Sequence, residues 1–210
     1  MSWIPSLVLT LAIAAVPTAQ AAPDSAAPGL ALGAAAPLRD VAMKGVNGKQ
    51  ISIADAAGKK GTLVLFICNH CPWVKAWQTR IAGIGNQALG RGVGVIAINP
   101  NDPAAFPEDD FGEMKARAKK LDFHFPYVMD TTSDVARAFA ATRTPEAYLF
   151  DAEGKLVYHG AVDDNAHDEK SVEHPWLRQA VEALAEAKPV PVAETKALGC
   201  GIRLRAKAAG

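Results

Sequence analysis

Two continuously apolar segments lie in the first half of the chain, at residues 61–67 (GTLVLFI) and 93–98 (VGVIAI). They lack the alternation of apolar and polar residues that marks a sheet with one face in water. We therefore expect two strands that are buried on both faces, as in a parallel sheet. Between them, apolar residues recur at the spacing of a helix, at Trp73, Trp77, Ile81 and Ile84. The order strand, helix, strand predicts a right-handed βαβ unit.

Shorter patterns predict the elements that flank this unit. Residues 41–54 form an expected β-hairpin, because the dipeptide Asn47-Gly48 suits a tight two-residue turn. Residues 106–121 are more polar but keep a helical apolar stripe, which predicts a helical insert. A short strand is expected over residues 125–129.

The C-terminal third predicts a helix, a second hairpin and a last helix. The first helix covers residues 133–141, with Ser133 as its N-cap. Two strands, over residues 146–150 and 155–159, enclose a turn, and a helix over residues 175–187 begins with a proline, which suits a first turn. Together these elements predict one α/β domain with a mixed central sheet, helices on both faces, an N-terminal hairpin and a helical insert.

Changes in composition divide the 210 residues into four parts. Residues 1–21 contain an apolar run, residues 7–16, that is too short to span a bilayer, which takes about 20 residues. Ala19-Gln20-Ala21 follows with the small-x-small pattern of a signal-peptidase site. We predict a cleaved signal peptide, with cleavage near Ala21, and a periplasmic or secreted protein without a further membrane span; an uncleaved anchor or a wrongly assigned start is the alternative.

The remaining three parts are a leader, the domain and a tail. Residues 22–37 are rich in alanine and proline and are expected to be a flexible leader. Residues 38–188 hold the expected domain, and residues 189–210 form a C-terminal tail with Cys200 between two glycines. The chain carries 22 basic and 22 acidic residues, so nothing in its charge predicts a nucleic-acid partner.

The pair Cys68 and Cys71 lies where the first buried strand meets its helix. Active sites of open α/β sheets lie at such carboxyl ends. We expect Cys68 at the start of the helix and Cys71 in its first turn, where the helix dipole and free N–H groups favour a thiolate at Cys68. That thiolate would attack a disulfide, and Cys71 would resolve the mixed disulfide. Asn69 and His70 are expected to tune the redox potential, His70 by a hydrogen bond or a positive charge near Cys68.

Other uses of the pair have weaker support. A four-residue ring between cysteines stabilises a fold by only about 2 kcal/mol, so a purely structural disulfide is a poor explanation. A zinc site would need Cys200 and one of the scattered histidines, none of which lies at ligand spacing, and we predict no metal. Haem attachment needs His after the second cysteine, and Pro72 stands there.

From about Leu38 to Pro191 the chain resembles the thioredoxin superfamily. Within it, the chain is most similar to the peroxiredoxin-like branch (alkyl hydroperoxide reductase/thiol-specific antioxidant, or redoxin) and to exported thioredoxin-like reductases. The residues that carry the resemblance are LFICNHCPWVKAW (65–77) and TRTPEAYLFDAEGKLVYHG (142–160). The tail sequence PVAETKALGCGIRL (191–204) also looks like the ending of a peroxiredoxin-like subgroup with a CNHCP motif.

The resemblance implies a thioredoxin-like fold and an exported thiol–disulfide oxidoreductase that needs no cofactor. It maps the cis proline that binds substrate backbone onto Pro145, preceded by Thr144, and Pro72 and Trp73 are expected on the exposed rim, with a core position for Trp73 as the alternative. The implied partners are protein or small thiol and disulfide substrates and an upstream thiol redox partner.

Two rival functions stay open. A thiol peroxidase would oxidise Cys68 or Cys71 to a sulfenic acid, with Cys200 as the resolving thiol, but the PxxxTxxC signature of peroxiredoxins is absent. A copper carrier of the same fold would use CxxxCP, and this chain has CxxCP. An idle or buried thiol is the simpler expectation for Cys200.

Overall fold

The computed structural model describes Met1 and residues 29–206. The predicted signal peptide over residues 1–21 lies outside the described residues except for Met1, as does the first part of the expected leader. The end of that leader pairs with the domain: the N–H of Gly33 donates to the carbonyl of Leu156, and the N–H of Leu156 donates to the carbonyl of Ala34. Residues 33–34 are therefore part of the folded domain.

The central strands form two hydrogen-bonded sets, in the orders β2-β1-β5-β4 and β3-β7-β8. Their bounds are β1 (Met43–Gly45), β2 (Gln50–Ile51), β3 (Gly61–Phe66), β4 (Val93–Asn99), β5 (Tyr127–Met129), β7 (Glu146–Asp151) and β8 (Leu156–Gly160). The pair β4–β5 is parallel, while β1–β2, β1–β5, β3–β7 and β7–β8 are antiparallel. Strand β3 runs beside β4, with the N–H of Ile67 donating to the carbonyl of Ile98. The predicted mixed sheet is confirmed, and so are both predicted hairpins.

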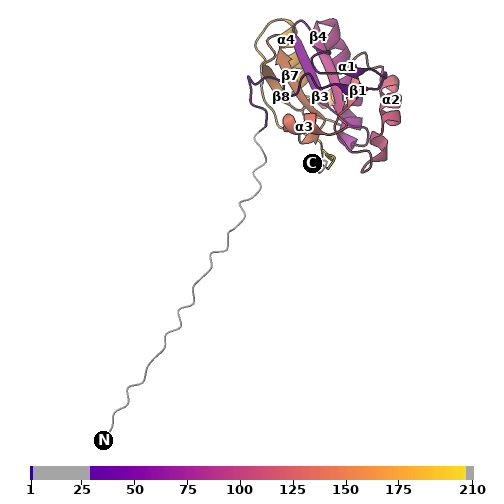
Figure 1. Cartoon of the computed structure of the whole chain (residues 1–210). Coiled ribbons are helices and arrows are strands. Elements are labelled where there is room, and N and C mark those ends of the chain that lie inside the picture. The colour runs from indigo at the N-terminus through magenta and orange to yellow at the C-terminus, as the bar shows by residue number, and fades with distance from the viewer. Residues whose placement is uncertain (2–28, 207–210) are drawn as a thin grey trace.

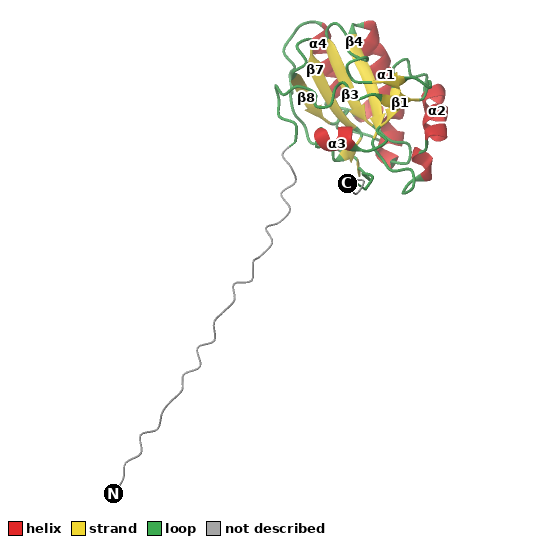
Figure 2. Ribbon diagram, in the orientation of Figure 1, coloured by secondary structure: helices red, strands yellow, loops and turns green. Residues whose placement is uncertain are grey.

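Helices lie on both faces of this sheet (Figure 1). Their bounds are α1 (Pro72–Gly90), α2 (Phe111–Lys120), α3 (Asp134–Ala138) and α4 (Trp176–Ala185), with short 3-10 turns at Pro107–Asp109 and Glu169–Ser171. Figure 2 shows α1 and α4 behind the strands and α3 in front. Successive residues of β3 divide between these layers: Leu63 and Leu65 pack in the cluster that includes α1 and α4, whereas Val64 and Phe66 pack with α3. Because both faces are covered, β3 and β4 are buried along their whole length, as their apolar sequences predict.

Two details of the helices differ from expectation. The insert begins with a 3-10 turn and has its helix only from Phe111, where Asp110 caps the N-terminus by accepting from the N–H of Glu113. Ser133 does occupy the N-cap of α3, but its side chain does not cap the helix. The Ser133 hydroxyl donates to the carbonyl of Pro100. In the first turn of the helix, the N–H of Ala136 donates to the side chain of Asp130. No helix among the described residues is both long and apolar enough to cross a membrane.

The C-terminal tail folds back over the domain, and this the sequence did not predict. The N–H of His159 donates to the carbonyl of Ala193, and the N–H of Thr195 donates to the carbonyl of His159, which lays the tail beside β8. Two two-residue strands then pair antiparallel, β6 (Arg143–Thr144) with β9 (Cys200–Gly201). The described chain ends near α3, as Figure 1 shows, where the N–H of Arg205 donates to the Ser133 hydroxyl.

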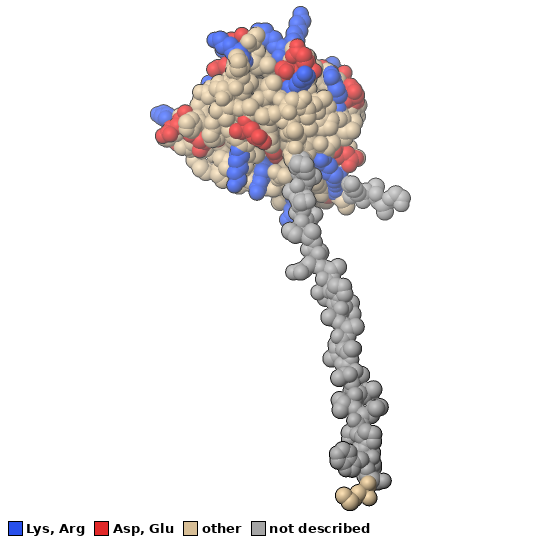
Figure 3. Space-filling model, turned by 90° about the vertical axis from the view of Figure 1, so that its left-hand side faces the viewer, with Lys and Arg blue, Asp and Glu red and all other residues tan. Residues whose placement is uncertain are grey.

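The surface carries acidic and basic side chains side by side. In the view of Figure 3, blue and red groups are intermixed around a broad area of uncharged residues. The balanced charge of the sequence is thus not separated into one basic and one acidic side on this face.

Candidate active site

The two cysteines of the CxxC motif lie in the connection between β3 and α1, and both are fully buried. Cys71 is the N-cap of α1, and Pro72 occupies the first helical position, where its missing N–H costs nothing. Cys68 lies three residues before this N-cap. The expectation that Cys68 starts the helix and Cys71 lies in its first turn is therefore wrong, because the proline fixes the helix start at residue 72.

The loop around Pro145 faces both sulfurs. The Thr144–Pro145 peptide bond is cis, as the resemblance predicts. The Thr144 hydroxyl lies 3.0 Å from the Cys68 Sγ, and the Thr144 carbonyl oxygen lies 3.2 Å from the Cys71 Sγ. A single residue thus contacts both members of the cysteine pair, one through its side chain and one through its backbone.

Cys200 reaches the same place on the folded-back tail. In the β6–β9 pair it lies opposite Thr144, and its Sγ is 2.6 Å from the Cys71 Sγ. It is partly exposed, in contrast to the other two cysteines. All three cysteines of the chain therefore meet at one site.

The surroundings of the cysteines give them different acidities. The hydrogen bond that joins Cys71 to the Cys68 thiol lowers the pKa of Cys71 to about 5 against the effect of burial, and the Cys200 thiol and the N–H of Val74 lower it further. The same bond to Cys71, burial and the charge of Asp109 raise the pKa of Cys68, while the Thr144 hydroxyl opposes them. These contacts favour the thiolate at Cys71 over the predicted one at Cys68, because Cys71 shares the hydrogen bond of the Cys68 thiol and Cys68 lies near the charge of Asp109.

A buried carboxylate that sequence reasoning missed holds the residues between the cysteines. Asp109 Oδ1 accepts the backbone N–H groups of Asn69 (2.5 Å) and His70 (3.2 Å). Its Oδ2 lies 2.6 Å from Nδ1 of His70 and accepts from the Asn101 side chain at 2.8 Å. The His70 ring also stacks on Phe106, 3.7 Å between centroids. The expected hydrogen bond from His70 to Cys68 is not found among the described residues, because Nδ1 of His70 is hydrogen-bonded to Asp109.

Asn69 points into the protein rather than toward a substrate. Its side-chain oxygen accepts from the Tyr127 hydroxyl at 3.2 Å, and its backbone carbonyl accepts from Arg117 at 2.9 Å. Its amide nitrogen is the one buried side-chain polar atom in the described part of the chain without a hydrogen-bond partner. Asn69 thus fixes the loop that carries Cys68, and any tuning of the cysteines through it is indirect.

A second carboxylate that the sequence did not predict, Glu146, is hydrogen-bonded to the backbone that leads into the Thr144–Pro145 loop. Glu146 Oε2 accepts the N–H groups of Thr142 and Arg143, both at 2.9 Å, and Oε1 lies 2.7 Å from Nε2 of His159. Burial would raise the pKa of Glu146, but these hydrogen bonds outweigh it and hold the pKa below its ordinary value. The sequence does contain a signal for this residue, a lone acid that opens the apolar strand EAYLF, whereas Asp109 lies in an irregular polar segment with none.

The rim of the site contains the two other predicted residues. Pro72 is exposed, and Trp73 is 37% exposed, which places Trp73 on the rim rather than in the core. Its neighbours along the helical stripe, Trp77, Ile81 and Ile84, are buried as predicted.

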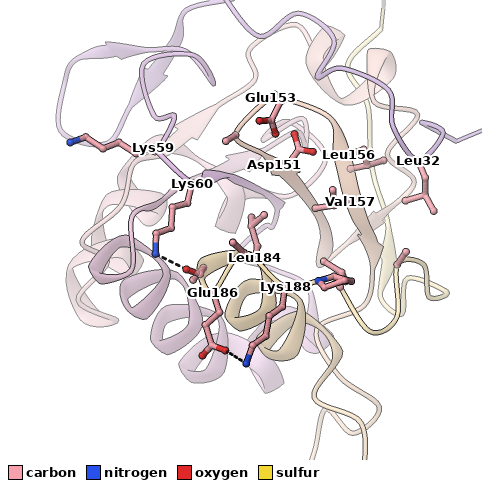
Figure 4. A pocket seen from close by; sticks show the side chains of 16 residues that line it. Leu32, Lys59, Lys60, Asp151, Glu153, Leu156, Val157, Leu184, Glu186 and Lys188 are labelled. Carbon is pink, nitrogen blue, oxygen red and sulfur yellow. Dashed lines mark hydrogen bonds and ion pairs between the residues drawn. The ribbon is translucent and has the colours of Figure 1, made fainter.

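A separate pocket among the described residues lies away from the cysteine site. It has a volume of about 910 Å³ and is lined by residues that include Lys60, Leu156, Leu184 and Lys188. Figure 4 shows it between β8, the end of α4 and the tail. Lys60 precedes β3 and Cys68 follows it, so the pocket and the cysteines are separated by about 20 Å of strand. The pocket is therefore not part of the cysteine site.

One group of possible metal ligands does overlap the cysteine site. Cys68, His70 and Asp109 each offer a ligand atom, and these atoms lie within 4.8 Å of one another. Thiolate, imidazole and carboxylate are the ligand types of zinc. Their arrangement is also accounted for by the hydrogen bonds between His70 and Asp109 described above.

Comparison with known proteins assigns the chain to a family. The AhpC/TSA family model matches residues 32–159, more than half of the chain. The chain belongs to the AhpC/TSA family. This AhpC/TSA protein is 28% identical over 119 residues to the thiol-disulfide oxidoreductase ResA of Bacillus subtilis (strain 168). That match covers 55% of this chain and 60% of ResA, so the chain spans less than two thirds of its curated relative.

Solved structures give the fold. An uncharacterised conserved protein of Geobacillus kaustophilus is 36% identical, with a TM-score of 0.78 over 85% of this chain and 95% of that one. A thioredoxin-like protein in its oxidised form matches with a TM-score of 0.58 and 20% identity, over 73% of this chain and 97% of that one. This AhpC/TSA chain therefore has the thioredoxin-like fold that its sequence predicts.

Proposed function

We propose that this protein is an exported thiol–disulfide oxidoreductase that works through a reversible Cys68–Cys71 disulfide. The observation that carries the proposal is the contact of Thr144, at the cis proline, with both cysteine sulfurs. Similarity to ResA, named as a thiol-disulfide oxidoreductase, supports the reaction class. Export is proposed from the N-terminal sequence, and an oxidising compartment is where such a disulfide persists.

Cys68 is the sulfur that we assign to the external partner. Cys71 is covered by Cys200 and by the Thr144 carbonyl, so a partner disulfide has less room there. As the partner approaches, the Cys68 proton passes to Cys71 along the hydrogen bond between them. The Thr144 hydroxyl donates to the resulting Cys68 thiolate, which attacks one partner sulfur and expels the other as a thiolate.

Cys71 then completes the transfer. The partner thiolate expelled in the first step takes up the Cys71 proton, and the Cys71 thiolate, which its contacts with Cys200 and the N–H of Val74 favour, attacks Cys68 in the mixed disulfide. The Cys68–Cys71 disulfide forms, and the partner leaves as a second thiolate, so two electrons have moved from the cysteine pair to the partner. The reverse sequence oxidises a dithiol. Thr144 and Pro145 present backbone to the partner, and Pro72 and Trp73 form the rim around it.

The test is a redox titration of the mature chain, from residue 22, in glutathione buffers, followed by thiol labelling. A Cys200→Ser variant isolates the proposed pair, and a Cys68→Ser variant is its control. A reversible two-electron couple in Cys200→Ser is expected. A potential of about −120 to −180 mV would identify a disulfide donor, and about −270 mV would identify a reductase. Two thiols that stay unpaired across the whole titration would refute the proposal.

A thiol peroxidase is the second candidate, favoured by membership in the AhpC/TSA family and by the Thr144 hydroxyl beside Cys68. It predicts that hydrogen peroxide converts Cys68 to a sulfenic acid faster than it oxidises an ordinary thiol. Trapping that acid with a dimedone probe in the Cys71→Ser variant measures this. Equal labelling in native and unfolded protein would exclude the peroxidase.

A further inference from the structure

The tail strand β9 occupies the edge that the proposed function assigns to the partner's backbone. Thr144 pairs with Cys200 and Arg143 pairs with Gly201, so the β6 edge next to Pro145 is already hydrogen-bonded. The Arg143 side chain also donates to the carbonyl of Gly199. The tail therefore brings a cysteine to the cysteine pair in the manner of a bound peptide.

Gly199 permits this close approach. A Cβ atom at position 199 would lie 2.2 Å from the carbonyl oxygen of Thr144 and 2.6 Å from its carbonyl carbon. A Cβ at position 201, on the other side of Cys200, would meet nothing within 4 Å. There is thus no room for a side chain at position 199, beside the Thr144 backbone, whereas position 201 has room for one.

The distance between sulfurs suits a bond. The Cys200 Sγ lies 2.6 Å from the Cys71 Sγ, and a disulfide is about 2.05 Å long. We propose that Cys200 is a third redox-active cysteine, which takes the disulfide over from the buried pair by forming a Cys71–Cys200 bond. This inference rests on the proposed Cys68–Cys71 couple and adds the step that follows it.

The step is a thiol–disulfide exchange within the chain. The Cys200 thiolate attacks the Cys71 sulfur of the Cys68–Cys71 disulfide, the Cys71–Cys200 bond forms, and Cys68 leaves as a thiolate. The proton that Cys200 loses to water is balanced by the one that Cys68 takes up. No outside oxidant is needed, because one disulfide is present before and after the step.

The charge of Cys71 contributes to the acidity of Cys200. In the reduced protein, burial and then the hydrogen bond to Cys71 and the Cys71 charge raise the pKa of Cys200 to about 11. Once Cys71 is bonded to Cys68 it carries no charge, and the last two causes disappear. Cys200 is then more readily ionised in the oxidised protein, which is the state in which its attack is productive.

The exchange moves the disulfide outward. Cys68 and Cys71 are fully buried, whereas Cys200 is partly exposed. An upstream thiol donor can attack the Cys200 sulfur of the Cys71–Cys200 disulfide without entering the site, while Cys68 is free again for its own partner. Cys200 thus separates the contact with the donor from the contact with the substrate.

Peptide mapping of the full mature chain tests the step. The Cys68→Ser variant is incubated with oxidised glutathione, digested without reduction and analysed by mass spectrometry, with Cys68→Ala as a second variant in case serine disturbs the fold. A linked peptide pair that contains Cys71 and Cys200 is expected. Glutathione adducts or free thiols at both positions, in a variant whose circular dichroism shows it to be folded, would overturn the inference.

Two further variants test whether the Cys71–Cys200 disulfide depends on the packing of the tail against Thr144 or forms by random collision of thiols. Gly199→Ala should lower the yield of the Cys71–Cys200 disulfide by at least about tenfold, since overpacking of this kind commonly shifts an equilibrium by that factor. Gly201→Ala, the matched control, should leave the yield unchanged. Equal yields in both variants would refute the packed approach of the tail.

The two proposals fail in different ways. If Cys200→Ser shows a reversible Cys68–Cys71 couple while Cys68→Ser forms no Cys71–Cys200 bond, only the third cysteine's role is wrong. If Cys200→Ser shows no couple, the proposed function itself is wrong, and a Cys71–Cys200 bond would then be the disulfide of the protein.

Discussion

Replacing Asp109 with Asn tests how the loop that carries Cys68 is held. Four donors point at the two oxygens of this buried carboxylate, namely the N–H groups of Asn69 and His70, the Nδ1 of His70 and the side-chain amide of Asn101. An asparagine keeps one oxygen and replaces the other with a donor. Its oxygen can retain the two backbone N–H groups, but the new amide then faces the amide of Asn101.

The cost follows from these contacts. A hydrogen bond to a charged group contributes about 1.5–3 kcal/mol, and one between neutral groups about 0.5–1.5 kcal/mol, so the two backbone bonds lose roughly 1 kcal/mol each. The Asn101 amide is left buried without its acceptor, which costs about 1–3 kcal/mol. Asparagine is neutral, so the variant no longer bears the free-energy cost of burying a charge, and this offsets part of the loss. We expect Asp109→Asn to lower the free energy of unfolding by about 2–4 kcal/mol.

Urea unfolding followed by circular dichroism measures the change. With a slope of about 2 kcal/mol per M, the midpoint should fall by about 1–2 M. Asp110→Asn is the matched control, since Asp110 is an exposed N-cap and asparagine caps equally well. Removing the Asp109 charge should also lower the pKa of Cys68, stabilise the reduced pair and make its potential more oxidising. A midpoint and a potential equal to those of the native protein would refute the role of Asp109.

Four further outcomes can be measured. In α1, Gly83→Ala should raise the free energy of unfolding by about 0.5–1 kcal/mol, because alanine favours a helix and its Cβ meets nothing. Gly85→Ala should lower the free energy of unfolding by about 1–3 kcal/mol, since its Cβ would lie 2.4 Å from the Phe125 ring. If urea unfolding showed Gly85→Ala to be more stable than Gly83→Ala, the contact of α1 with Phe125 would be contradicted. Ultraviolet thiolate absorbance of the reduced protein should show Cys71 ionised above about pH 5, and a midpoint near the ordinary 9.0 would contradict this. Because the pKa of Glu146 is lowered in the folded state, its ionised form stabilises the fold fully above about pH 4.5, and this stabilisation is lost as the pH falls through the folded-state pKa. In Glu146→Gln, the midpoint temperature of thermal unfolding should therefore fall less steeply with decreasing pH than in the native protein.

Most of the fold could be predicted from the sequence. The strands β3 and β4 are apolar along their whole length and the helix α1 carries a regular stripe, so local pattern and burial agree at each of them. The hairpin around Asn47-Gly48 forms, but its turn is not the predicted two-residue one: the N–H of Gly48 donates to the carbonyl of Gly45, and Gly48 has a positive φ whereas Asn47 does not. The cis bond before Pro145, which the family resemblance implies, is confirmed. The strands β6 and β9 were missed because two-residue strands have no period, and their pairing joins residues that lie far apart in the chain.

The site was only half predictable. Two cysteines separated by two residues mark their own position, since the chemistry of the pair depends on their spacing in the chain. The positions of Asp109, Glu146 and Cys200 depend on packing between remote segments, and no local pattern encodes such contacts. Tertiary structure alone brings Cys200 to Cys71, and it reverses the expected order of acidity, because proton sharing and burial depend on distances in space and not on spacing in sequence.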